Sequence, residues 1–281
     1  MKTLIIGHKG MLGQALIKIL EEKGWEYKGY DRDEIDITDA PQVLARICNY
    51  NPELLINTAA YNAVDKAEDE PEIAMLVNGT AVGYLAQAAK KCGAIFVHYS
   101  TDFVFDGKNE VGYDENSKPN PLSVYGRSKL KGEEETMAAS LLVWYIIRTS
   151  RLFGPPGIST GSKKSFPKLM IDLAKEKEEL KAIDAEVSSP TYVKDLAEKT
   201  LAIVEARLDS GIYHATNSGG CTWYGYAKTA FAAAGLKTRI IPVASDHFPR
   251  KAERPAHSIL ISTKTPPMRP WHQALDEFLR L

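Results

Sequence analysis

Tyr125 and Lys129 are the two residues whose types and spacing point most directly to chemistry. Turn-forming residues precede Tyr125 and helix-forming residues follow it, so a helix that begins near Val124 places both side chains on one face. A free phenol, with a pKa near ~10, is a weak acid at neutral pH, and a nearby ammonium lowers that pKa. Such a pair suits protonation of a carbonyl oxygen while a hydride arrives at the carbon. Spacing alone favours the alternative of two surface residues on an amphipathic helix, because Tyr-x-x-x-Lys is common, and the rest of the chain reverses that preference.

A glycine-rich turn near the N-terminus predicts where a dinucleotide binds. Residues 2–6 read as a buried parallel strand, and a G-x-x-G-x-x-G turn and a helical pattern follow it. Glycines let the backbone approach a pyrophosphate at the N-terminus of a helix. The cofactor contacts predicted at this turn are Gly7, His8, Gly10, Met11, Leu12 and Gly13.

Asp31 and Arg32 end the second predicted strand, residues 25–30. An acid roughly 20 residues past the glycines meets the ribose hydroxyls of a dinucleotide, whereas an arginine suits a 2′-phosphate. Because the two residues favour different cofactors, we expect weak discrimination, with a moderate preference for NADPH over NADH. A solvated turn is the alternative. Asp36 and Ile37, in the turn that follows, complete the contacts predicted at this end.

Small and hydroxyl-bearing residues follow the next two predicted strands, residues 54–60 and 94–99. The carboxyl ends of parallel strands face the ligand crevice, so small residues there leave room for a cofactor. Asn78 lies within a long predicted helix, residues 71–92, where its side chain is either solvated or bonded to a neighbouring loop. The cofactor contacts predicted in this part are Ala59, Ala60, Tyr61, Asn78 and Ser100, together with Tyr125 and Lys129.

Strands and helices alternate up to about residue 150, which predicts an α/β fold with a doubly wound parallel sheet of the Rossmann type. The pattern then changes to loop-rich sequence at residues 154–157 and 159–162 and to irregularly spaced elements. We therefore predict a dinucleotide-binding domain over residues 1–150 and a smaller C-terminal substrate domain over residues 151–281. Parts of the second segment, about 180–208, are expected to return to the first domain.

Composition narrows the class of protein further. The 281 residues are 44% hydrophobic and 25% charged, as in ordinary globular proteins, and the formal net charge of -1 gives no electrostatic case for nucleic acid or an anionic membrane. The first apolar run is too short for a signal peptide, and no run approaches the ~20 residues of a membrane-spanning helix. Cys48, Cys92 and Cys221 are scattered, which predicts neither a disulfide framework nor a metal site. A cytoplasmic enzyme with reduced thiols fits best.

With these residues in place, the chain resembles the dTDP-4-dehydrorhamnose reductase family of extended short-chain dehydrogenases. Six stretches carry the resemblance in family order and span nearly the whole chain. They are the glycine turn 7–13, Asn57 to Glu68, Ser100 to Gly107, Tyr125 to Lys129 with Gly132-Glu133, Ser189 to Val193 with Asp195-Leu196, and Arg254 to Ser258 with Lys264.

The resemblance implies roles for individual residues. Tyr125 would protonate the C4 oxygen of a nucleotide sugar, Lys129 would hold the nicotinamide ribose and lower the Tyr125 pKa, and Thr101 would polarise the carbonyl. The hydride would come from NADPH or NADH, and the product would be dTDP-L-rhamnose. A homodimer is the protein partner that the resemblance allows. The residues expected along the substrate are Asp102, Phe105, Tyr125, Arg151, Glu186 and Arg254.

Departures from the family pattern gather at the substrate end. The family usually has tryptophan where Arg151 stands, and Gln and Gly where this chain has Glu186 and Ser188. The segment 154–166 is longer than usual, and Ser165 replaces an asparagine. Two new opposite charges near one pocket would compensate each other, so an Arg151–Glu186 ion pair is one hypothesis. The other is that Arg151 reaches a diphosphate or a polar sugar substituent.

Two alternatives to this reductase remain. Another nucleotide-sugar reductase or an epimerase would share the tyrosine and lysine, although an epimerase returns the hydride, and the segment from Arg254 to Lys264 favours a reductase. A regulatory subunit like that of methionine adenosyltransferase would bind NADP and a protein partner without catalysis. The complete set of Thr101, Tyr125 and Lys129 argues against that role.

Overall fold

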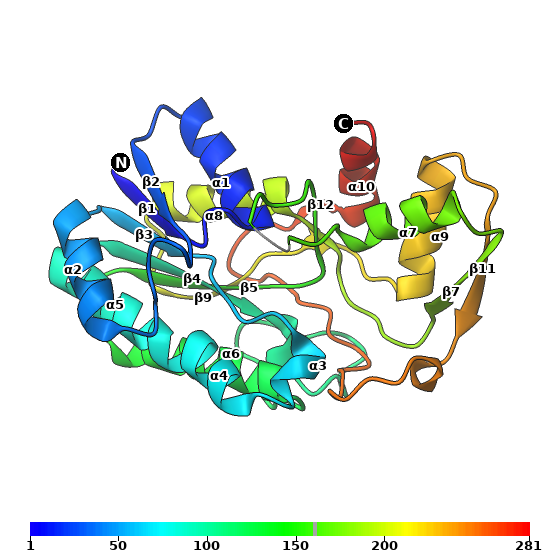
Figure 1. Cartoon of the computed structure of the whole chain (residues 1–281), viewed down its shortest axis with the longest axis horizontal. Helices are drawn as coiled ribbons and strands as arrows, with labels where there is room; N and C mark the ends of the chain where they lie inside the picture. Colours follow the sequence, from blue (N-terminus) through cyan, green and yellow to red (C-terminus); the bar gives the residue numbers. More distant parts are fainter. Residues whose placement is uncertain (160–161) are drawn as a thin grey trace.

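Six parallel strands form the central sheet of the computed structural model, which describes residues 1–159 and 162–281. The strand order is β2-β1-β3-β4-β5-β9 (Figure 1). The strands are β1 (Thr3–Ile6), β2 (Tyr27–Tyr30), β3 (Leu54–Asn57), β4 (Ile95–Thr101), β5 (Trp144–Thr149) and β9 (Gly211–His214). The chain reverses its winding direction between β1 and β3, and ligands of such sheets bind outside the carboxyl ends of the strands at that point.

Helices cover both faces of the sheet, which confirms the predicted doubly wound architecture (Figure 1). One face carries α1 (Met11–Glu22) and α8 (Val193–Glu205), which pack against each other. The other carries α2 (Ala40–Tyr50), α5 (Ala81–Cys92) and α6 (Val124–Ala138). Two apolar clusters fill the spaces between the layers, and strands with buried side chains on both faces contribute alternate residues to each. These clusters fix the strand ends that the site is built on.

The predicted helix over residues 71–92 is interrupted in the structure. It consists of α4 (Pro71–Met75), a π-helical turn (Leu76–Thr80) and α5, and a short helix, α3 (Val64–Ala67), precedes it. The π-helical turn contains Asn78, whose side chain is buried and bonded to residues outside the helix. Such turns widen a helix by one residue and are frequent at functional sites. Hydrophobic periodicity does not reveal them.

The second lobe lies beside the carboxyl ends of the strands (Figure 1). It contains α7 (Phe166–Ala174), β7 (Glu179–Ile183), α9 (Trp223–Ala233), β11 (Arg239–Val243) and α10 (Trp271–Leu279). Short strand pairs join it to the rest: β6 (Leu152–Phe153) with β8 (Thr191–Tyr192), and β10 (Asn217–Ser218) with β12 (Met268–Pro270). The apolar cluster on the α1 and α8 side of the sheet continues into this lobe.

The lobe boundary differs in one part from the predicted one. Residues 180–183 do not return to the central sheet, because β7 pairs in parallel with β11 inside the second lobe. Helix α8 lies against α1 and β9 extends the sheet beside β5. Residues 160 and 161, within the loop predicted at 159–162, lie outside the described residues. Of the helices in the described part of the chain, none has the length and apolar character needed to cross a membrane.

Candidate active site

The glycine turn brings the backbone of β1, β3 and α1 together at the point where the sheet reverses direction. Gly7 has φ +80°, and a Cβ there would lie 2.8 Å from the Ala59 nitrogen. A Cβ on Gly13 would lie 2.6 Å from the Gly7 oxygen. Helix α1 begins after Gly10 without a side-chain cap, so its first amide groups are available to a ligand. Uncapped N–H groups at a helix N-terminus fit a pyrophosphate.

Two adjoining cavities, of about 600 and 400 Å³, meet at this turn and share part of their lining. The residues common to both are Gly10, Thr58, Ala59, Ala60 and Asn62. Of the predicted cofactor contacts, the larger cavity adds Gly7, Asp31, Arg32, Asp36, Ile37 and Tyr61. The smaller adds Met11, Leu12, Gly13, Ser100, Tyr125 and Lys129. The two cavities together give space for both ends of a dinucleotide.

Two predicted cofactor side chains lie outside this groove. The His8 imidazole packs against Gly29, with its Nε2 3.1 Å from a Glu34 carboxylate oxygen, and lines a separate cavity on the outer side of α1. Asn78 is buried: its Oδ1 accepts from the Tyr61 amide at 2.8 Å and its Nδ2 donates to the Ser128 hydroxyl at 3.0 Å. Asn78 therefore holds the loop that lines the groove. This agrees with the prediction that its side chain is bonded to a neighbouring loop and not solvated.

Asp31 and Arg32 both line the larger cavity. The Asp31 carboxylate accepts hydrogen bonds from the backbone amides of Arg32 at 2.8 Å and Lys9 at 3.3 Å. The Lys9 ammonium is 2.5 Å from Asp33 and 3.8 Å from Glu34. Lys9 is thus already paired with acids.

Tyr125 lies in the first turn of α6, and Ser123 caps that helix. The Ser123 hydroxyl accepts from the Gly126 amide at 3.1 Å, and the Tyr125 ring packs edge-on to Phe103, 5.6 Å between centroids. Burial raises the pKa of the Tyr125 phenol to about 12, against a lowering contribution from the Thr101 hydroxyl. The lowered pKa predicted from the spacing to Lys129 is therefore wrong for this structure, because desolvation outweighs the polar neighbours.

Lys129 is buried one turn further along α6, and its ammonium donates to the Tyr99 carbonyl at 2.5 Å. Burial lowers the pKa of Lys129 to about 8, and the charge of Glu133 opposes this shift. Both Tyr125 and Lys129 line the 400 Å³ cavity, together with Thr101. The structure therefore brings the three predicted catalytic side chains to one cavity.

The end of β4 is fixed by polar contacts beneath the cavity floor. The Thr101 hydroxyl is 3.0 Å from one Asp102 oxygen, and the Ser258 hydroxyl donates to the other at 2.6 Å. Ser100 donates to Glu133 at 2.5 Å, and Glu133 forms a fully buried bidentate pair with Arg148 at 2.8 and 2.6 Å. Burial raises the pKa of Asp102, which lines the cavity as predicted.

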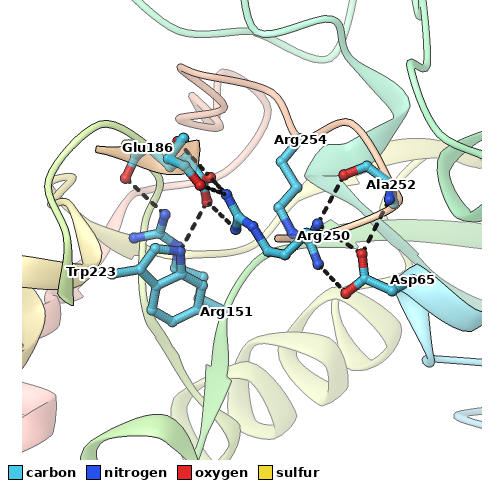
Figure 2. A network of polar contacts seen from close by, with 8 residues as sticks. Asp65, Arg151, Glu186, Trp223, Arg250, Ala252 and Arg254 are labelled. Carbon is cyan, nitrogen blue, oxygen red and sulfur yellow. Dashed lines mark hydrogen bonds and ion pairs between the residues drawn. The ribbon is translucent and has the colours of Figure 1, made fainter. Parts of the chain in front are cut away.

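The predicted ion pair between Arg151 and Glu186 does not form. Arg151 instead donates to two carbonyl oxygens, of Cys221 at 2.8 Å and of Glu186 at 2.9 Å. Figure 2 shows the second of these bonds. The Glu186 carboxylate is bonded to Arg250 and also accepts from the Trp223 indole at 3.1 Å (Figure 2). Arg151 lines the cavity, whereas Glu186 lies behind it. Arg250, which the sequence spacing did not identify, forms the ion pair with Glu186 instead.

Two further residues predicted along the substrate do not line the cavity. Phe105 is fully buried and stacks on Tyr113 with centroids 4.2 Å apart, so it belongs to the core. Arg254 forms a bidentate ion pair with Asp65 at 3.0 and 2.7 Å (Figure 2). A substrate would have to meet Arg254 in that paired state or displace Asp65.

Trp223 is the main lining residue that the sequence did not single out. It occupies the first position of α9, whose cap Thr222 accepts from the Gly225 amide at 3.0 Å. The cap could be predicted from the sequence, but no local pattern indicates that this helix start lines the same cavity as Tyr125. Thr58 was also missed: its hydroxyl donates to the Ile6 and Gly7 carbonyls and lines both cavities. Thr58 lies between Asn57 and the small residues after β3, and this position at a strand end could have identified it.

A doubly wound sheet with a glycine turn at its reversal point, joined to a cavity that holds Tyr125 and Lys129, defines a nicotinamide-dependent oxidoreductase of the Rossmann type. The chain belongs to the dTDP-4-dehydrorhamnose reductase family: the family model described as "RmlD substrate binding domain" matches residues 1–281. The resemblance found in the sequence is thereby confirmed.

Relatives in this family match the chain over nearly its whole length. A dTDP-4-dehydrorhamnose reductase of Streptomyces griseus is 36% identical, over 98% of this chain and 92% of its own. The spore coat polysaccharide biosynthesis protein SpsK of Bacillus subtilis is also 36% identical, over 99% and 97%. A crystal structure of dTDP-4-dehydrorhamnose reductase from Bacillus anthracis in complex with NADP matches with a TM-score of 0.94 at 34% identity, covering 99% of this chain and 98% of that one.

Proposed function

We propose that this protein reduces the 4-keto group of a nucleotide sugar with NADPH or NADH, and that its reaction is the conversion of dTDP-4-dehydro-L-rhamnose to dTDP-L-rhamnose. The observation that carries the proposal is the meeting of Thr101, Tyr125 and Lys129 in one cavity that opens onto the glycine turn. A reduced nicotinamide, when bound, supplies the hydride that the sugar carbon receives. Relatives named as dTDP-4-dehydrorhamnose reductases support the choice of sugar.

The residues of the chain divide the remaining work. Tyr125 gives its phenol proton to the C4 oxygen as negative charge develops there, and its raised pKa means that the proton is present at neutral pH. The Thr101 hydroxyl donates its single proton to Asp102 in the free protein and turns that proton to the same oxygen when the sugar binds. Lys129, whose ammonium is held by the Tyr99 carbonyl in the same cavity, holds a ribose hydroxyl of the cofactor.

Asp31 and Arg32 support use of both cofactors, with NADPH moderately preferred. Asp31 suits free ribose hydroxyls, and Arg32 lines the same cavity as the cation available for a 2′-phosphate. The test is the ratio of kcat/KM for NADPH and NADH in the wild type and in Arg32→Ala. Arg32→Ala should lower kcat/KM for NADPH alone. A wild-type preference for NADH above about a hundredfold would mean that Arg32 does not face the cofactor.

The decisive experiment offers a panel of 4-keto nucleotide sugars with NADPH and identifies the products by NMR. A reductase consumes NADPH in a one-to-one ratio with the 4-hydroxy sugar formed. Epimerisation would instead convert sugar without net loss of NADPH. Lack of turnover on every sugar, together with co-purification of a methionine adenosyltransferase, would support the regulatory alternative.

We further propose that the enzyme works in the cytoplasm as a homodimer. The cytoplasmic assignment is supported by three free cysteines, because thiols stay reduced there. The homodimer is supported by the resemblance to the family. Cell fractionation tests the first proposal and light scattering of the purified protein tests the second.

A further inference from the structure

Arg151 and Trp223 form one wall of the cavity that holds Tyr125 and Lys129. The central carbon of the Arg151 guanidinium lies 4.0 Å from the centroid of the Trp223 ring, so the two flat groups stack (Figure 2). Both residues are partly exposed. A stacked guanidinium is a rigid, preorganised donor, because one face is covered and its edge stays open.

The backbone and two carbonyls hold Arg151 in this position. Its Nη1 donates to the Cys221 carbonyl and its Nη2 to the Glu186 carbonyl, at 2.8 and 2.9 Å. Arg151 has φ +42°, in the left-handed region that residues other than glycine rarely adopt. Such a conformation persists only where the surroundings impose it, and it is common at ligand-binding sites.

The charge of Arg151 is not consumed by hydrogen bonds to a carboxylate. The Glu186 carboxylate is bonded to Arg250, Ser245 and the Trp223 indole. Asp102, the acid on the cavity floor, accepts from the hydroxyls of Thr101 and Ser258. An arginine carries five N–H donors. Arg151 uses two of them, and the other three have no partner within residues 1–159 and 162–281.

We propose that the stacked Arg151 is a specificity-determining residue that donates hydrogen bonds to the C2 and C3 hydroxyls of the sugar. This inference rests on the proposed function. In a 4-keto-6-deoxyhexose the C4 oxygen is assigned to Tyr125 and Thr101, and C6 is a methyl group. The remaining sugar hydroxyls are the adjacent pair at C2 and C3, and a guanidinium fork matches two adjacent oxygens.

The chemical consequence is discrimination against deoxygenated sugars. A site built to donate to a substrate hydroxyl rejects an analogue that lacks it, because a donor that the bound substrate covers is then left unpaired. Loss of a hydrogen bond to a charged group lowers kcat/KM by a factor on the order of 10 to 100. We expect the wild type to prefer the dihydroxylated 4-keto sugar over its 2,3-dideoxy analogue by at least that factor.

The experiment compares both sugars in the wild type and in Arg151→Met, which keeps the length of the side chain and removes its donors. Arg151→Met should lower kcat/KM at least tenfold on the dihydroxylated sugar and leave it nearly unchanged on the dideoxy analogue. Arg151→Lys, which retains a donor, should recover part of the preference. Arg239→Met, at a mostly exposed arginine of β11, is the matched control and should behave as the wild type.

Three outcomes would overturn the proposal. The first is an equal loss on both sugars, which would make Arg151 a structural support. The second is that Arg151→Met loses as much affinity for dTDP alone, measured by calorimetry, as for the nucleotide sugar. That result would place the arginine at the diphosphate. The third is an unchanged preference in Trp223→Leu and Arg151→Met, both shown to be folded by circular dichroism.

Failure of the proposed function is separately visible. If the wild type reduces neither sugar, the reductase assignment fails. The affinities of dTDP-L-rhamnose and its 2,3-dideoxy analogue for wild type and Arg151→Met then test the wall without turnover. The proposed role of Arg151 is supported if the ratio of the affinity for dTDP-L-rhamnose to that for the dideoxy analogue falls at least tenfold in the variant. An unchanged ratio refutes that role.

Discussion

Desolvation dominates the protonation of the two central residues. It raises the pKa of Tyr125 and lowers that of Lys129, and so shifts the equilibrium of each group toward its neutral form. A neutral phenol is the form a proton donor needs before the reaction. A lysine with a pKa of about 8 remains mainly cationic at neutral pH, but it loses its charge under mildly alkaline conditions.

Tyr125→Phe should reduce kcat by about 10²- to 10⁴-fold, which is the usual value of general acid catalysis. The ring still packs on Phe103, so cofactor affinity and thermal stability should stay near those of the wild type. Stopped-flow turnover and fluorescence titration with NADPH measure the two quantities. Wild-type turnover in this variant would remove Tyr125 from the mechanism.

Lys129 should give the enzyme an alkaline limit. Its ammonium predominates below pH about 8, so kcat/KM for the cofactor should fall as the pH rises through that value. Stability changes in the opposite sense. An unfolded lysine keeps its proton up to about pH 10.4, so the unfolded state binds more protons above pH 8 and the free energy of unfolding rises with pH there.

Lys129→Arg is the control for this pH dependence, because its guanidinium stays charged. Its activity should be lower but should lack the fall near pH 8. In Lys129→Met, the rise in unfolding free energy between pH 8 and 10 should disappear. If the activity of Lys129→Arg declines with the same midpoint as the wild type, another group titrates.

At the scale of elements, local patterns were sufficient for the parts of the site that local chemistry builds. The glycine turn, the helix that begins near Tyr125 and the hydroxyls after β4 all follow from short-range rules about turns, caps and strand ends. The π-helical turn at Asn78 was not predictable, because the apolar residues before it and after it follow the same helical period. Nor was the pairing of β7 with β11, which depends on contacts far apart in sequence.

The partners of charged side chains were the least predictable part of the site. Arg151 and Glu186 looked complementary in sequence, but Arg250 lies closer to the acid in the fold. Phe105 looked like a ligand contact because of its neighbours in the motif, yet it is a core residue under Arg148. Such choices depend on which loops meet, and a sequence motif contains no information about distance between loops.

Arg148→Met tests the buried ion pair that links β5 to α6. Arg148 and Glu133 are 1% and 0% exposed in their side chains, so the substitution leaves a carboxylate buried with Ser100 as its neutral partner. Removing one partner of a buried pair costs about 3–5 kcal/mol in the free energy of unfolding. Urea denaturation measures this loss.

The matched control is Arg127→Met, at an exposed arginine of α6, the helix that carries Glu133, and it should change stability by less than about 0.5 kcal/mol. The double variant Arg148→Met with Glu133→Leu removes both charges and should recover much of the lost stability. Equal stability of the single and double variants would show that the unpaired carboxylate is not the cause.

At the scale of the whole molecule, the segment 250–254 connects the two lobes. Arg250 is bonded to Glu186 in the second lobe, while Arg254 and the Ala252 amide are bonded to Asp65, beside the cofactor groove (Figure 2). The segment therefore spans the junction between the two lobes. Any change in the separation of the lobes must alter one of these two anchors.

Asp65→Ala should release the first-lobe anchor of this segment without unfolding the protein. The Asp65 side chain is 44% exposed, so its ion pair contributes at most about 1 kcal/mol to stability, and the melting temperature should change little. Hydrogen exchange at residues 250–254 should nevertheless accelerate, because the Ala252 amide and Arg254 lose their acceptor. KM for the nucleotide sugar should rise, with kcat less affected.

Asp69→Ala provides the matched control, since Asp69 holds the same segment only through Lys251, and both side chains are more than half exposed. Its exchange rates and KM should remain close to those of the wild type. Faster exchange in both variants to the same extent would mean that general charge attraction holds the segment. Unchanged exchange in Asp65→Ala would mean that Arg250 and Glu186 alone fix it, and that the substrate finds Arg254 in a position independent of Asp65.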